Sequence, residues 1–298
     1  MRPAWSVILL TTLIGAGQGL FLALAALDAF GEAPARFFLA GAALALVLLA
    51  AGLAASFFHL GRPERAWRSA AMWRTSWLAR EVIVLPAFMA VVLGWGVAHW
   101  LHVDTFWFNL AGTVLGIALF VCTGMIYACL EFLQEWHTPL TPLNYTLLGC
   151  ASGLTAAAAL AALMHAPVAP VYATAALAVG AAAYLARLAA LARNARLRPK
   201  STPATAIGIK HPRIAQIAQG AMGGSFNTRE FFHGRPREVV RAARWAFLAL
   251  VFPLPALLLV LGFGLPAFFL QFAGLLAERW YFFAEAKHPQ NIYYQAIA

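Results

Sequence analysis

Apolar residues fill long continuous runs along this chain, and short polar segments separate them. Each run has about 20 residues or more, enough for a helix to cross the roughly 30 Å hydrocarbon core of a membrane. The ten-residue alternating segments of a membrane β-barrel do not occur. The pattern predicts an all-α polytopic membrane protein, one membrane domain over residues 1–298 with eight transmembrane helices. The predicted spans are Pro3–Phe30, Ala35–Phe58, Glu81–Leu101, Asn109–Leu133, Leu143–His165, Val168–Leu191, Ala242–Leu261 and Leu265–Ala284.

Composition agrees with this pattern. The chain is 62% hydrophobic and only 11% charged, whereas soluble domains carry about 25% charged residues. The apolar run after Arg2 reaches Phe30, which is too long for the apolar core of a signal peptide. Cys122, Cys129 and Cys150 have no CxxC spacing and are typical of small packing residues in membrane helices. Three cysteines cannot supply the four thiolates of an iron–sulfur cluster.

Basic residues orient the predicted spans. With eight spans, both termini share one face with the loops that follow spans two, four and six. Of the 21 Lys and Arg residues, only Arg36 falls on the opposite face. The positive-inside rule therefore predicts that both termini and the basic loops are cytoplasmic. Topology and attraction to anionic lipid headgroups account for most of the net charge of +10.

The cytoplasmic loop over residues 192–241 is too rich in Phe, Ile and Gly for a disordered basic linker. Phe226, Phe231 and Phe232 lie beside Arg229, and aromatic residues and arginine are favoured at protein interfaces. We therefore expect this loop to dock a partner subunit. Nucleic acid is not expected as a partner, because no nucleic-acid-binding module accompanies the charge.

Small and polar residues inside the spans predict helix packing rather than transport. Gly149, Gly153 and Gly180 are typical of close helix-packing surfaces on the fifth and sixth spans, and Gln18 and Gln271 favour hydrogen bonds between helices. A secondary transporter would require repeated halves, broken helices or buried charges, and the sequence shows none convincingly.

Histidine placement argues against a membrane cytochrome, which needs histidines from different spans at matching depths. All eight histidines fall at span ends or in loops. We therefore expect no haem and no metal in this chain. A haem near the cytoplasmic surface, bound by His59 and His137, is the alternative.

The stretch over residues 56–84 concentrates polar and aromatic residues between two apolar runs. His59 ends the second span and Glu81 opens the third, so both side chains can face one pocket. A quinone needs hydrogen bonds to its two oxygens and two protons per turnover, which histidine and glutamate can supply. Three further residues could contact the ring: Arg65, Trp73 and Arg80. Alternatively, the HLGRP segment is a helix stop, Glu81 is a capping charge and the arginines are topology signals.

A second polar cluster lies on the same predicted face. Glu131 and His137 close the fourth span, and Tyr127 lies one turn deeper. Tyr127 could complete the quinone pocket, with Glu131 and His137 forming a proton path. They could equally be ordinary interfacial polar residues.

Two motifs, HLGRPERAWRSAAMWRTSWLAREVI and MIYACLEFLQEWHTPLTPLNY, carry a resemblance to the membrane-anchor family of the dimethyl sulfoxide reductase type. The resemblance covers essentially the whole chain. It implies a multi-pass protein of the bacterial inner membrane that holds an iron–sulfur subunit and a molybdopterin catalytic subunit on the cytoplasmic side. It also implies that the chain binds quinone itself without haem, with the family's quinol-site residues falling on His59 and Glu81.

Within this family, the MGGSFNTREFFHG segment is most similar to anchors of cytoplasmic, quinone-linked sulfite dehydrogenases. That resemblance implies a chain that passes electrons from sulfite oxidation to membrane quinone and does not touch the sulfur substrate. The alternatives are an anchor working in reverse, which oxidises quinol to reduce dimethyl sulfoxide or polysulfide, a non-redox transporter and a purely structural tether.

Overall fold

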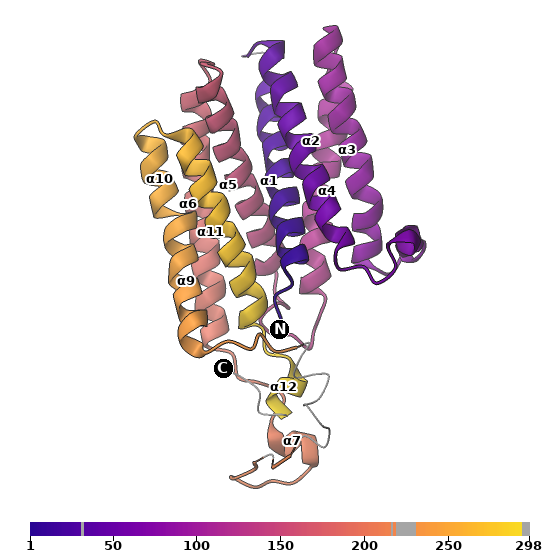
Figure 1. Ribbon diagram of the computed structural model, residues 1–298, viewed down its shortest axis with the longest axis vertical. Coiled ribbons are helices and arrows are strands. Elements are labelled where there is room, and N and C mark those ends of the chain that lie inside the picture. The colour runs from indigo at the N-terminus through magenta and orange to yellow at the C-terminus, as the bar shows by residue number, and fades with distance from the viewer. Residues whose placement is uncertain (31–32, 216, 219–230, 294–298) are drawn as a thin grey trace.

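The computed structural model describes residues 1–298 except 31–32, 216, 219–230 and 294–298. Every regular element in the described residues is helical, and the long helices stand side by side in an upright bundle (Figure 1). The long helices are α1 (Trp5–Asp28), α2 (Ala35–Phe57), α3 (Trp77–Leu101), α4 (Phe106–Ala128), α5 (Leu140–Leu163), α6 (Ala169–Ala195), α9 (Arg237–Val251) and α11 (Gly264–Glu285). The shorter ones are the 3₁₀ helix η1 (Pro63–Met72), α7 (Pro203–Ile207), α10 (Pro253–Val260) and α12 (Pro289–Tyr293).

Seven helical segments are long and apolar enough to cross a membrane, within the part of the chain that the structure describes. They match the first seven predicted spans. The seventh segment runs over Arg237–Val260 and is divided at Pro253 into α9 and α10, because proline removes a backbone donor and clashes with the preceding turn.

The predicted eighth span corresponds to α11, which extends along the bundle beside α9 and α5 (Figure 1). Glu278, Arg279 and Glu285 lower the mean hydropathy of its second half, and α11 is not among the seven segments. The count of eight is therefore not confirmed, and a membrane-crossing α11 stays a prediction.

The first helix lies at the centre of the bundle. It packs against α2, α5, α4 and α11, and α5 in turn packs against α6 and α11. Glycines allow α1 and α5 to touch: a Cβ added at Gly19 would overlap the backbone of Gly149, and one at Gly153 would overlap Gly19. The close packing predicted for Gly149 and Gly153 is confirmed. Gly180 on α6 differs, because a Cβ there would meet open space.

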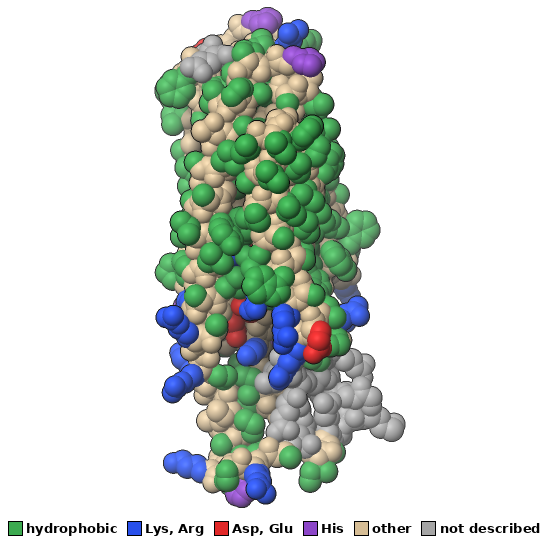
Figure 2. Space-filling view, turned by 90° about the vertical axis from the view of Figure 1, so that its left-hand side faces the viewer, with side chains coloured by type: hydrophobic (Ala, Val, Ile, Leu, Met, Phe, Trp, Pro, Cys, Tyr) green, Lys and Arg blue, Asp and Glu red, His purple; other side chains and the backbone are tan. Residues whose placement is uncertain are grey.

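The polar segments gather at one end of the bundle. The N-terminus, η1, α7 and α12 all lie at the lower end in Figure 1. Figure 2 shows hydrophobic side chains over most of one face, with Lys and Arg concentrated below them. The N-terminus thus lies at the same end of the bundle as these basic loops, and the cytoplasmic location of both termini and of the loops stays a prediction.

Candidate functional site

The candidate site lies where α2 ends and α3 begins, at the basic end of the bundle. Ser76 caps α3, and its hydroxyl accepts a hydrogen bond from the Ala79 amide at 3.3 Å. The helix therefore starts at Trp77, one turn earlier than predicted, and Glu81 lies in its second turn. The alternative interpretation of Glu81 as a capping charge is wrong, because Ser76 occupies the capping position.

Glu81 points into the bundle. Only 8% of its surface is exposed, and its carboxylate accepts a short hydrogen bond from the Thr123 hydroxyl of α4. Both residues line a small cavity of about 10 Å³, enough for one water molecule. The cavity is lined by Thr11, Ile14, Gly15, Gln18, Glu81, Phe120, Thr123, Tyr145 and Arg279.

His59 has a different environment. It lies exposed two residues beyond the end of α2, and it is not among the residues that line the cavity of Glu81. Partial burial lowers the pKa of its imidazole, which favours the neutral ring. The two predicted quinone ligands thus lie at the same end of two packed helices, one at the surface and one inside.

The segment between them forms η1, which has no buried residue and extends sideways from the bundle (Figure 1). Arg65 is half-exposed and lies 3.8 Å from Glu64, and Trp73 is 51% exposed. Arg80 holds the end of this segment, because its guanidinium donates to the carbonyl oxygens of Trp73 at 2.9 Å and Arg74 at 2.8 Å. Arg80 therefore has a positioning role that the sequence did not reveal.

Tyr127 is buried among aromatic rings rather than facing the surface. It stacks on Tyr145 at 5.4 Å between centroids and meets the ring edges of Trp136 and Phe282. Glu131 is exposed beyond the end of α4. His137 is also exposed, and its Nδ1 lies 2.7 Å from the Ala128 carbonyl oxygen. The structure does not bring these three residues together around the Glu81 cavity.

A buried ionic cluster borders that cavity. Glu278 lies between two arginines, 2.9 Å from Arg187 and 3.1 Å from Arg279, and none of the three is more than 4% exposed. The Arg279 guanidinium also stacks over the Tyr145 ring at 3.7 Å. The positive-inside rule predicts a place on the basic surface for Arg187 and Arg279, but both are buried. Their location within predicted spans was the signal that could have identified them.

Small polar cavities lie between Glu81 and the end of the bundle. Tyr145 and Arg279 line both the Glu81 cavity and a second cavity of about 10 Å³ that also touches Glu278 and Glu135. Glu135 in turn lines a wide pocket of about 310 Å³. Buried polar atoms border the second cavity without a hydrogen-bond partner among the described residues, namely Asn144 Oδ1 and Arg187 Nη2. Such atoms indicate internal water sites.

The predicted docking loop is described in part. Phe231 and Phe232 are half-buried, and the Phe231 ring stacks on His288 of the C-terminal segment at 4.0 Å. Phe226, Arg229 and most of the MGGSFNTREFFHG motif lie outside the described residues. In the described residues, no group of three or more His, Cys, Asp or Glu side chains is arranged to hold a metal ion.

Comparisons with known proteins give one consistent result. Residues 1–209 match the family model described as DMSO reductase anchor subunit (DmsC). The chain is also 55% identical, over the full length of both chains, to a sulfite dehydrogenase subunit of Allochromatium vinosum.

Proposed function

This chain belongs to the DMSO reductase anchor subunit family and is therefore a multi-pass membrane anchor of an oxidoreductase. We propose that it transfers electrons from a cytoplasmic iron–sulfur subunit to membrane quinone. The buried Glu81 carboxylate carries this proposal. A carboxylate inside a membrane protein, held by one donor beside a water-sized cavity, is costly to bury and is a default candidate for proton transfer.

Quinone reduction consumes two electrons and two protons and yields quinol. In the proposal, the ring enters beneath η1 between His59 and Glu81, near Trp73 and Arg65, which are both about half exposed. The His59 N–H donates a hydrogen bond to one quinone oxygen and relays to that oxygen a proton taken up from water at the surface. Glu81 delivers a proton to the other oxygen and is reprotonated from inside the bundle.

The cavities favour a proton route different from the predicted one through Glu131 and His137. In this proposal, protons enter at Glu135 and reach Glu81 past Glu278, Arg279 and Tyr145 through internal water. Tyr127 packs against Tyr145 and fixes its ring, which is a supporting role. Electrons and protons would then arrive at the same quinone from the basic end of the bundle.

We further propose that the complex oxidises sulfite and that a molybdopterin subunit performs that reaction. Support comes from the similarity to the sulfite dehydrogenase subunit of Allochromatium vinosum. The sulfur substrate does not meet this chain, so its residues determine quinone chemistry alone. No haem is assigned to the chain, and a haem b band in the optical spectrum of the purified complex would contradict that assignment.

The function is tested by sulfite-dependent quinone reduction in the purified complex. We expect His59→Ala to reduce the rate by at least about tenfold, because one hydrogen bond to the ring is lost at a cost of roughly 1.5 kcal/mol. His211→Ala is the matched control, since His211 is exposed and, among the residues that the structure describes, bonds to Arg213 of its own loop. Wild-type rates for His59→Ala in an intact complex would refute the site, and loss of the partner subunits during purification would indicate a docking defect instead.

A further inference from the structure

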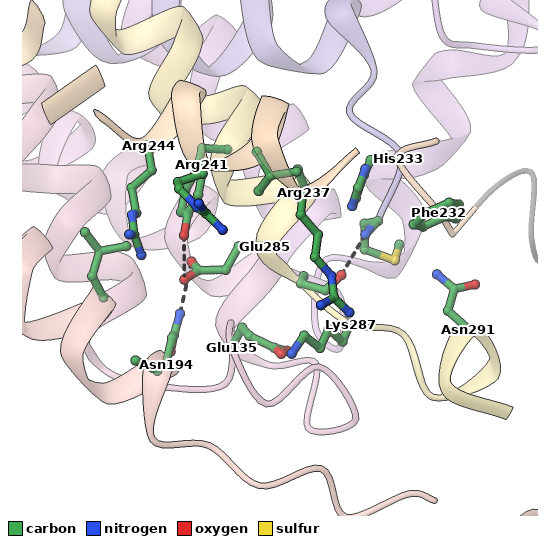
Figure 3. A pocket seen from close by; sticks show the side chains of 17 residues that line it. Glu135, Asn194, Phe232, His233, Arg237, Arg241, Arg244, Glu285, Lys287 and Asn291 are labelled. Carbon is green, nitrogen blue, oxygen red and sulfur yellow. Dashed lines mark hydrogen bonds between the residues drawn. The ribbon is translucent and has the colours of Figure 1, made fainter. Parts of the chain in front are cut away.

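A pocket of about 310 Å³ lies between α6, α9 and α11, separate from the cavity that Glu81 lines (Figure 3). Four cationic side chains line it against two carboxylates. The cations are Arg237, Arg241, Arg244 and Lys287, and the carboxylates are Glu135 and Glu285. The pocket is therefore positively charged and opens at the basic end of the bundle.

Three of these cations form a stripe on α9. Arg237, Arg241 and Arg244 are spaced by four and three residues, which places them on one helix face. Arg237 and Arg241 are exposed, and their guanidinium groups make no hydrogen bond or ion pair with any residue that the structure describes. These two arginines are available to an anionic ligand.

Glu285 does not neutralise the stripe by direct pairing. Its carboxylate accepts hydrogen bonds from Asn194 at 3.2 Å and from the Tyr281 hydroxyl at 3.3 Å, both drawn in Figure 3. The carboxylate is thus held by neutral donors on the pocket wall. A phosphate placed over Arg237 and Arg241 would meet donors that carry full charge and form strong hydrogen bonds.

A second, apolar cavity lies farther along the same helices. This groove of about 220 Å³ lies between α6 and the junction of α9 with α10, and its walls include Leu177, Gly180, Tyr184, Phe252 and Leu259. Leu191 lines the charged pocket and lies seven residues, about 10.5 Å, along α6 from Tyr184 of the groove. Gly180 leaves the groove open, since a Cβ there would touch nothing.

We propose that this seam binds an anionic phospholipid, with its phosphate over Arg237 and Arg241 and one acyl chain in the groove beside Gly180. Basic pockets between membrane helices suit acidic headgroups. A carboxylate of a partner protein would use the arginines and leave the groove empty. A quinone would suit the groove and gain nothing from the arginines. A phospholipid can use both the arginines and the apolar groove. This inference does not depend on the function proposed for Glu81.

Native mass spectrometry of the full chain in detergent tests the site, with phosphatidylglycerol and phosphatidylcholine as probes. We expect phosphatidylglycerol to bind in preference to phosphatidylcholine. The double variant Arg237→Gln/Arg241→Gln should bind phosphatidylglycerol about 30-fold more weakly, because each basic residue near the surface contributes about fivefold. Lys210→Gln/Arg213→Gln removes the same charge from exposed positions beyond α7 and should leave binding unchanged.

A second variant tests the groove without changing charge. Gly180→Leu fills open space, so it should fold, and it should weaken binding of long-chain but not of short-chain phosphatidylglycerol. Inorganic phosphate should compete weakly, because it cannot occupy the groove. Equal binding of both lipids, an unaffected double variant, or inorganic phosphate that binds as tightly as the lipid would each overturn the proposal.

Discussion

Two buried carboxylates lie near opposite ends of the bundle, and they are held very differently. Asp28, at the end of α1, accepts from Trp95 at 3.0 Å and from Thr105 and Asn109 at 2.8 Å each, and His99 Nε2 lies 3.2 Å away. Glu81 accepts from Thr123 and borders a cavity. A carboxylate surrounded by donors ties helices together, whereas one with a single donor and adjacent space can exchange a proton.

The largest effect should follow from Glu81→Gln. The amide keeps the size of the side chain and can still accept from Thr123, but it cannot transfer a proton. We expect quinone reduction to fall by about 10²–10⁴-fold, the usual contribution of a general acid or base. The thermal midpoint of the chain in detergent should not decrease. Stopped-flow quinone reduction by the assembled complex measures the effect. A rate within threefold of wild type would show that Glu81 does not transfer the proton.

Asp28→Ala should lower stability and leave quinone reduction nearly unchanged, the opposite of Glu81→Gln. It leaves His99, Trp95 and Asn109 without their shared acceptor, and breaking such a buried pair costs about 3–5 kcal/mol. Thermal unfolding in detergent should show a clear loss of stability. The quinone KM and the rate per folded complex should remain near wild type, and a selective loss of activity with unchanged stability would show that Asp28 also takes part in chemistry.

Thr123→Val tests the hydrogen bond that Thr123 donates to Glu81. The change preserves shape and removes the hydrogen bond to Glu81, which is worth about 1.5–3 kcal/mol because one partner is charged. We expect roughly tenfold slower quinone reduction and a shifted pH profile, measured by steady-state kinetics between pH 5 and 9. Thr155→Val is the control, since Thr155 donates only to Ala151 within its own helix. Equal effects of both substitutions would argue against a special role for Thr123.

The smallest effect should come from Arg80→Gln. The substitution removes two hydrogen bonds that fix the end of η1, worth about 1 kcal/mol each. We expect the quinone KM to rise several-fold with little change in kcat, because η1 borders the proposed entrance. Arg68→Gln is a suitable control, as the Arg68 guanidinium lies over Trp67 on the same exposed segment. A drop in kcat instead would indicate that Arg80 acts on the chemical step.

The sequence predicted the parts of this molecule that depend on local composition. Continuous apolar runs identified seven segments that the structure also marks as able to span a membrane, and Gln18 donates to the Gly116 carbonyl of α4 as expected for a polar residue between helices. The ends of α3 and α4 were misplaced by several residues, because capping by Ser76 and the turn after Ala128 are set by short-range geometry.

Features that depend on contacts between distant helices were not predicted. Tyr145 and Arg279 meet Glu81 only because α5 and α11 pack against α1, and no local pattern encodes that arrangement. Arg279 lies near the end of its apolar run, where a charge is typical of a membrane boundary. Tyr127 appeared accessible in the sequence but is enclosed by rings from the next helix, α5, and from α11, which is far away along the chain.

The central location of α1 has a consequence for biogenesis. This helix is made first, yet the backbone that fits against Gly19 includes Gly153, which is synthesised 134 residues later. At ordinary translation rates of about 5–20 residues per second, the glycine face of α1 waits roughly 7–27 s for its permanent neighbour. During that interval lipid, the insertion machinery or another nascent helix must cover it. Assembly of the bundle is thus timed by the arrival of α5.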